Sequence, residues 1–211
     1  MTLKLWHCHN ARSLRPLWAM EEMGFDYELE ILPFPPRFFK KEFLGINVLG
    51  TVPFFEDGKT TMTESSAICH YLVDRYGRYD FGLKPDHAEF GDYLNWLYHS
   101  DATLTFPQTI YLRYTMLEQG DRKLPQAAED YRAWFIARLR KLDAHILDRE
   151  YLVDGRFTIA DIAIGYALHL GQSLGIDGEY SPQASAYLAR LQERPAFKKT
   201  VGMGAENSPF K

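Results

Sequence analysis

The clearest chemical pattern in the sequence is the polar stretch Thr-Glu-Ser-Ser at residues 63–66. It stands directly before an apolar run at residues 67–73, and hydroxyl and carboxylate side chains in that position are typical of a helix N-terminus. The first turn of a helix presents free backbone N–H groups and partial positive charge, which bind carboxylates. The sequence therefore predicts an anion-binding helix start at Glu64 and Ser65.

A β-hairpin is predicted just upstream of that helix. Val52 and Pro53 lead into the apolar pair at residues 54–55, and Asp57-Gly58 is a turn dipeptide. Proline has no backbone N–H, so Pro53 belongs at the start or the edge of a strand. The hairpin and the following helix form a ββα arrangement that presents residues 52–66 together.

A strand, a helix and a second strand precede this arrangement. Residues 3–6 and 27–31 alternate between apolar and polar types, and residues 12–23 carry apolar side chains at helical spacing up to Gly24. Two parallel strands joined by a helix form a βαβ unit. Residues 1–78 are thus expected to form a βαβ-ββα domain, and Gly82 and Pro85 mark a linker at residues 79–86.

Residues 87–211 are predicted to form an all-helical domain. One long helix is expected over residues 87–118 with a kink or a break at Pro107, and another over residues 124–151. Thr158 and Asp161 have the spacing of a capping box for a further helix. Replacement of Asp161 by alanine is therefore expected to cost on the order of one kcal/mol of stability or more.

Taken together, Val52-Pro53 followed by Glu64-Ser65 resembles the glutathione-binding core of the cytosolic glutathione transferases, and the resemblance extends over residues 1–205. It implies an α+β fold, with a thioredoxin-like domain followed by a helical bundle, and it implies that Pro53 is a cis-proline. It also implies that the Val52 backbone pairs with the cysteinyl part of glutathione, and that Glu64 and Ser65 hold the γ-glutamyl end. Alternatively, Pro53 is an ordinary trans proline and Ser65 an ordinary helix cap.

Two further parts of the chain carry candidate glutathione contacts by the same resemblance. In the family, the segment after the second strand reaches the glycine carboxylate, which nominates Arg37 and Lys40; a solvated basic surface is the alternative. The residue nearest the sulfur follows the first strand, where the family's serine or cysteine position falls on Asn10. Asn10 ranks first, Ser13 second and Arg12 third for this role, unless Asn10 only shapes the turn.

The loop also contains Cys8, a candidate redox nucleophile because some members of the family use a cysteine near this position. It lies two residues from the family's cysteine position, and a cysteine acting as a small buried apolar residue is common. Cys69 falls within the apolar pattern of the helix after residue 65 and is expected in the core. An acceptor substrate, by the same resemblance, would contact aromatic and histidine side chains of the helical domain, which could equally be core residues: Trp96, His99, Phe106, Tyr111, Tyr114 and Tyr166.

Composition narrows the class of protein. The formal net charge of −4 gives no general basic field for nucleic acid, and no run is long enough to span a membrane. Two cysteines make neither a disulfide framework nor a zinc site, so no metal is expected. The default expectation is a cytoplasmic protein without a membrane or nucleic-acid partner.

The resemblance implies glutathione transfer to a small, hydrophobic and aromatic electrophile, by a homodimer with a detoxification or catabolic role. Glutathione would be the co-substrate. A rival enzymatic function is glutathione-dependent reduction of disulfides or peroxides without a catalytic cysteine. A third possibility is a non-catalytic binding or interaction protein on the same scaffold.

Overall fold

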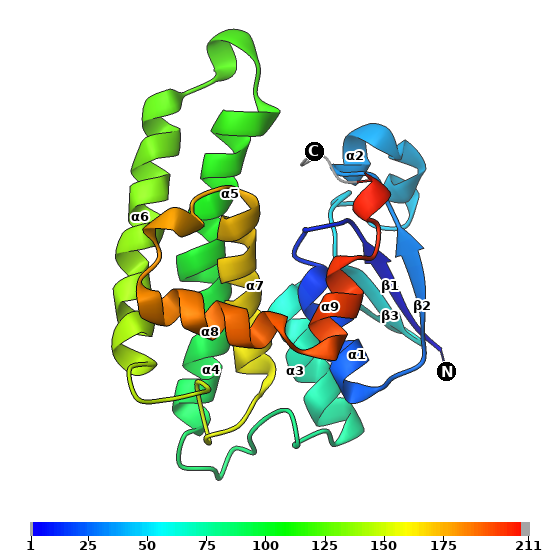
Figure 1. The fold of residues 1–211 in the computed structure, drawn as a ribbon. Helices are drawn as coiled ribbons and strands as arrows, with labels where there is room; N and C mark the ends of the chain where they lie inside the picture. Colours follow the sequence, from blue (N-terminus) through cyan, green and yellow to red (C-terminus); the bar gives the residue numbers. More distant parts are fainter. Residues whose placement is uncertain (1, 208–211) are drawn as a thin grey trace. The chain divides into compact units, whose positions relative to one another are not determined.

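The computed structural model describes residues 2–207, which form two compact units (Figure 1). The first unit contains the described residues up to Gly82 together with those from Gln192 onward, and the second spans Leu83–Leu191. The break after Gly82 lies within the expected linker. The sequence predicts that residues 87–211 all belong to the helical domain, whereas the structure places residues 192–207 in the first unit.

A four-stranded mixed sheet is the centre of the first unit. Its strands are β1 (Leu3–His7), β2 (Tyr27–Ile31), β3 (Phe54–Asp57) and β4 (Thr60–Met62), in the order β2-β1-β3-β4. The pair β1–β2 is parallel, and β3 runs antiparallel to both β1 and β4. This arrangement confirms the thioredoxin-like βαβ-ββα prediction.

Four helices belong to this unit: α1 (Leu14–Met23), the short α2 (Pro36–Phe39), α3 (Ser65–Tyr76) and α9 (Pro195–Val201). Figure 1 shows α1 and α3 on one side of the sheet, where they pack against each other. The helix expected from residue 12 begins two residues later, at Leu14. Gly24 ends α1 with a φ of 67°, a left-handed conformation that favours glycine.

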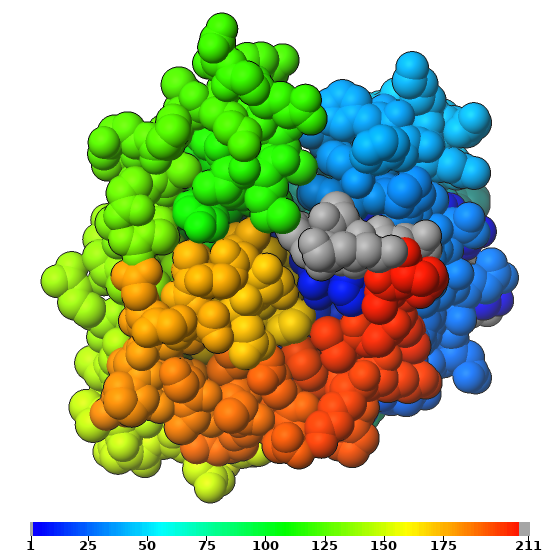
Figure 2. Space-filling model, turned by 45° about the horizontal axis from the view of Figure 1, so that its top comes forward, coloured from blue at the N-terminus to red at the C-terminus, as the bar shows by residue number. Residues whose placement is uncertain are grey.

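The C-terminal segment joins the first unit through α9. The Phe197 ring meets the Trp18 ring of α1 edge-on, with centroids 4.9 Å apart, and Arg194 forms a bidentate ion pair with Glu22. Farther along, the Met203 carbonyl oxygen lies 3.4 Å from His9 Nδ1. Figure 2 shows the red C-terminal segment beside the dark blue N-terminal segment. These contacts explain why residues 192–207 depart from the predicted domain range 87–211.

The second unit is helical, as predicted. Its helices are α4 (Phe90–His99), α5 (Phe106–Leu112), α6 (Pro125–His145), α7 (Ile159–Ser173) and the larger part of α8 (Pro182–Gln192). Between α4 and α5 the chain winds through a π-helical stretch, Ser100–Thr105, directly before Pro107. The irregularity expected at this proline is thus present, and the helix expected over residues 124–151 ends earlier, at His145.

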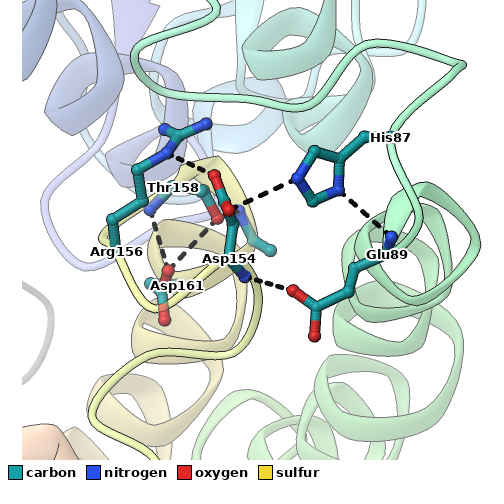
Figure 3. A network of polar contacts seen from close by, with 7 residues as sticks. His87, Glu89, Asp154, Arg156, Thr158 and Asp161 are labelled. Carbon is teal, nitrogen blue, oxygen red and sulfur yellow. Dashed lines mark hydrogen bonds and ion pairs between the residues drawn. The ribbon is translucent and has the colours of Figure 1, made fainter.

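The start of α7 is held by the capping box that the sequence predicts. Thr158 Oγ1 accepts a hydrogen bond from the Ala160 N–H at 3.2 Å, and the Asp161 carboxylate accepts one from the Thr158 N–H at 2.8 Å. Figure 3 shows that the preceding loop is fixed as well, because Asp154 contacts His87 at 3.3 Å and donates its N–H to Glu89.

Candidate functional site

The start of α3 is the centre of the candidate site. Ser65 is the first helical residue and Glu64 occupies the N-cap position, with an exposed side chain that makes no capping hydrogen bond. The Ser65 side chain is almost fully buried, and its Oγ accepts a hydrogen bond of 2.9 Å from Nη1 of Arg15. Ser65 is therefore not an ordinary N-cap, and a guanidinium group reinforces the positive end of the helix.

Val52 and Pro53 precede β3 as predicted, and the peptide bond between them is cis. The β1–β3 ladder runs from the pair Leu3–Asp57 to the pair Trp6–Phe54, so Val52 lies just outside it. The Val52 N–H and C=O are consequently not used in strand pairing, and they could pair with the backbone of a bound peptide.

The loop between β1 and α1 carries the three residues nominated for the sulfur. Asn10 is half-buried and has a φ of 56°, a left-handed conformation that asparagine tolerates better than most residues. The turn-shaping role and a ligand role are both compatible with this geometry. Arg12 is also half-buried, and it lies before α1 instead of at its first turn.

Ser13 differs from its predicted role. It is fully buried, and its Oγ lies 2.9 Å from His7 Nδ1 while accepting a hydrogen bond from the Cys8 N–H at 3.3 Å. A hydroxyl group enclosed by these contacts holds the loop and does not face a ligand. Burial lowers the pKa of His7 to about 4, so His7 is neutral in this arrangement.

Neither cysteine forms a disulfide bond, and both are fully buried. Burial raises the pKa of Cys8 to about 12, and its Sγ lies 3.6 Å from the Pro33 carbonyl oxygen. Because the thiolate is the reactive form of cysteine, this environment supports the structural role of Cys8 and opposes a redox role. Cys69 belongs to the core of α3, as predicted.

Arg37 and Lys40 lie in and just after α2, and both are exposed. The Arg37 guanidinium lies over the neighbouring Phe38 ring, 4.8 Å from its centroid. Either cation could reach an anionic ligand, and either could equally be a solvated surface group.

The candidate acceptor residues divide into two groups. Trp96 and Tyr166 are each 1% exposed, so they are core residues, the alternative that the sequence left open. His99 contacts the Trp96 ring edge-on, and burial lowers its pKa to about 4, assisted by Lys141. By contrast, Tyr111 and Tyr114 are half-buried and Phe106 is 46% exposed. Only these last three present substantial aromatic surface.

Neither a metal site nor a membrane span stands out in residues 2–207. No group of three or more histidine, cysteine, aspartate or glutamate side chains within this part of the chain could hold a metal ion. No helix described there combines the length and the apolar character needed to cross a bilayer.

A thioredoxin-like unit with a helical second unit defines the class of fold, and comparisons with known proteins identify the family. Residues 1–74 match the family described as "Glutathione S-transferase, N-terminal domain". Glutathione S-transferase 3 of Schizosaccharomyces pombe is 25% identical, covering 91% of this chain and 84% of that protein. Protein LigF of a Sphingobium strain is 27% identical, and the match covers 94% of this chain and 93% of that protein.

The solved structure of a protein with a similar sequence matches the fold of this chain over nearly its whole length. It is the glutathione transferase URE2P6 of Phanerochaete chrysosporium in complex with oxidized glutathione, with a TM-score of 0.83, 27% identity and 98% coverage of both chains. The chain belongs to the glutathione S-transferase family, and its enzyme class is glutathione S-transferase.

One residue of the candidate site was missed by sequence reasoning. Arg15 lies within the apolar pattern of residues 12–23, where it looks like a solvent-facing charge. Its only signal was an arginine within an otherwise apolar helix face, next to Leu14 and Pro16, both of which are buried. Contact with Ser65, fifty positions away, depends on the packing of α1 against α3.

Proposed function

We propose that the first unit binds glutathione along the start of α3 and the residues before β3. Ser65 and Glu64 would hold the γ-glutamyl end, and the backbone of Val52 next to Pro53 would pair with the cysteinyl residue. The observation that carries this proposal is the buried Ser65 hydroxyl, held by Arg15 at the N-terminus of α3. A hydroxyl group, free helical N–H groups and a cation together favour a carboxylate ligand.

Asn10 is proposed to stabilise the glutathione thiolate. Its amide nitrogen can donate a hydrogen bond to the sulfur, which favours the anion and lowers the thiol pKa. An asparagine has no proton to lose and forms no disulfide, so the thiol proton would pass to solvent. Attack of the thiolate on an electrophilic carbon then forms the new C–S bond and displaces the leaving group. Arg12, a cation in the same loop, is proposed to assist in stabilising the thiolate.

For the electrophile, we propose a small hydrophobic compound, aromatic in character. Phe106, Tyr111 and Tyr114 of the second unit offer aromatic surface that is not fully buried in the core. Aromatic rings contribute both apolar burial and ring–ring contact to such a ligand. Arg37 and Lys40 are proposed to assist at the glycine end of glutathione.

A homodimer is proposed from an exposed apolar surface on the first unit. Within residues 38–49, six large apolar side chains are exposed: Phe38, Phe39, Leu44, Ile46, Val48 and Leu49, of which Val48 is 86% exposed. Exposed apolar side chains in such number commonly mark a protein interface. Sedimentation equilibrium of wild type and Val48→Asp tests this proposal, because a charge in that surface would shift a dimer toward monomer.

A glutathione-dependent reductase is the second candidate function. It is favoured by URE2P6, a relative whose solved structure contains oxidized glutathione. The buried Cys8, with its raised pKa, means that such an activity would require a second glutathione instead of a protein thiol. A cytoplasmic location is proposed as well, because neither cysteine forms a disulfide bond, which suits a reducing compartment.

Calorimetric titration with glutathione and separately with glutathione disulfide tests the proposed function. Wild type, Asn10→Ala and Ser65→Ala are compared, with Ser185→Ala, an exposed serine of α8, as the matched control. Loss of a hydrogen bond to a charged group predicts about ten- to hundredfold weaker glutathione binding by Ser65→Ala. Absence of glutathione binding by wild type would overturn the proposal, and much tighter disulfide binding would favour the reductase.

A further inference from the structure

We propose that Arg15 is a positioning residue that fixes the Ser65 hydroxyl as a hydrogen-bond donor to the γ-glutamyl carboxylate of glutathione. The proposal rests on the proposed function, because it concerns the same site. It goes further by assigning the selectivity for a charged end group to a residue that is not expected to contact the ligand.

The direction of the hydrogen bond between Arg15 and Ser65 follows from their chemistry. A guanidinium group has only donors, so the 2.9 Å contact between Nη1 and Ser65 Oγ uses a lone pair of the serine oxygen. Arg15 is fully buried and Ser65 is 2% exposed, so water competes little for this contact. The serine oxygen is therefore held as an acceptor from α1.

The proton of the Ser65 hydroxyl is left for another acceptor. In the part of the chain that the structure describes, Ser65 accepts the bond from Arg15 and donates none. An O–H group whose oxygen accepts a bond from a cation is polarised and becomes a better donor. The Ser65 side chain can in principle both donate and accept a hydrogen bond. Arg15 occupies it as an acceptor and so makes it a directed donor at the N-terminus of α3.

The preferred ligand group follows from the charges. A carboxylate accepts the Ser65 proton in a charge-assisted hydrogen bond, which is roughly twice as strong as a bond between two neutral groups. A neutral carboxamide in the same place accepts the same proton only in the weaker bond between neutral groups. The site should therefore discriminate between a glutathione with a free γ-glutamyl carboxylate and its carboxamide.

The experiment measures binding by the full chain of two probes: glutathione, and glutathione whose γ-glutamyl α-carboxylate is replaced by a carboxamide. The proteins are wild type, Arg15→Met, Arg15→Lys, Ser65→Ala and the double variant Arg15→Met/Ser65→Ala. We expect Arg15→Met to weaken glutathione binding at least tenfold and carboxamide binding less than threefold. Arg15→Lys, which keeps a charged donor, should recover part of the loss.

Two readouts separate positioning from a general structural role. In turnover assays, Arg15→Met should raise KM for glutathione and leave kcat at saturation within about twofold, because the reacting sulfur is not touched. If Arg15 acts through Ser65, the double variant should bind glutathione less than threefold more weakly than Ser65→Ala alone. Circular dichroism and thermal melting establish that each variant is folded.

Several results would overturn the inference. They are equal binding of both probes by wild type, an equal loss of both probes in Arg15→Met, and losses that multiply in the double variant. If Arg15→Met does not fold, Arg15→Lys still decides, because it must weaken the binding of glutathione more than the binding of the carboxamide. Wild type that binds neither probe would instead refute the proposed glutathione site, so the two failures are distinguishable.

Discussion

Asp161 is the residue whose removal should most clearly weaken the second unit. Its carboxylate is fully buried and accepts four hydrogen bonds: from the N–H groups of Leu152 and Thr158, from the Thr158 hydroxyl and from the Tyr187 hydroxyl. The distances are 3.0, 2.8, 3.2 and 2.8 Å, respectively. Figure 3 shows Asp161 facing Thr158. One side chain therefore joins the loop before α7, the first turn of α7 and helix α8.

The expected cost of Asp161→Ala follows from the donors left behind. The two hydroxyl groups can rotate toward other acceptors, but the buried N–H groups of Leu152 and Thr158 cannot. An unsatisfied buried donor costs about 1–3 kcal/mol, which gives roughly 4 kcal/mol for the pair. For a chain of this size that corresponds to a fall in Tm of about 8–16 °C. This exceeds the loss expected from a capping box alone.

The cost should also depend on pH. Burial raises the pKa of Asp161 from 3.8 to about 6, so between these values the folded state holds a proton that the unfolded state has released. Wild-type stability from this group therefore falls as pH rises through that window. The wild type gains roughly 2 kcal/mol at pH 4.5 relative to pH 7.5 from this linkage. Asp161→Ala lacks the gain, so its deficit should be larger at pH 4.5.

Urea unfolding of wild type and Asp161→Ala, followed by circular dichroism at the two pH values, measures both effects. Asp148→Ala, an exposed aspartate after α6, is the control and should stay within about 0.5 kcal/mol of wild type. A deficit below about 1 kcal/mol at pH 7.5 would contradict the hydrogen-bond argument. A deficit that grows toward pH 7.5 would contradict the raised pKa.

Three further predictions concern the first unit. Cys8 and Cys69 should resist iodoacetamide at pH 8 in the native protein and react after unfolding, because both are buried; mass spectrometry of native Cys8 showing rapid alkylation would contradict this. His7→Gln should flatten the stability loss between pH 6.5 and 4, since the lowered pKa of His7 makes the folded state bind fewer protons there; unchanged urea midpoint differences would count against it. Phe197→Ala should cost about 3–4 kcal/mol by removing the edge contact with Trp18, with a change in tryptophan emission, and an unshifted thermal melt would argue against this packing.

Local patterns accounted for most of the elements. Strict alternation at residues 27–31 and apolar spacing up to Gly24 predict β2 and α1, because each pattern has the period of its own element. The capping box of Thr158 and Asp161 is equally local, since its donors and acceptors lie within four residues. Element ends were less accurate: α6 stops at His145, and α1 starts at Leu14.

Contacts between distant segments could not be predicted in this way. The sequence alone did not reveal that Ser13 is enclosed by His7 and Cys8, because neighbours in a loop can point to solvent or to the core. The attachment of α9 to α1 through Phe197 and Trp18 depends on which helix faces meet in space. The same is true of Trp96, whose aromatic ring suits both a ligand contact and a core.

The sequence by itself determined the order of the elements, the family and the helix start that carries Ser65, because these depend on short-range periodicity, capping and a recognisable spacing from Val52-Pro53. Only the tertiary structure decided which charged group contacts that helix start. Arg15 and Ser65 belong to different helices, and their hydrogen bond exists because α1 and α3 pack against each other. Burial and the direction of a hydrogen bond, which together set the chemistry of the site, are properties of that packing.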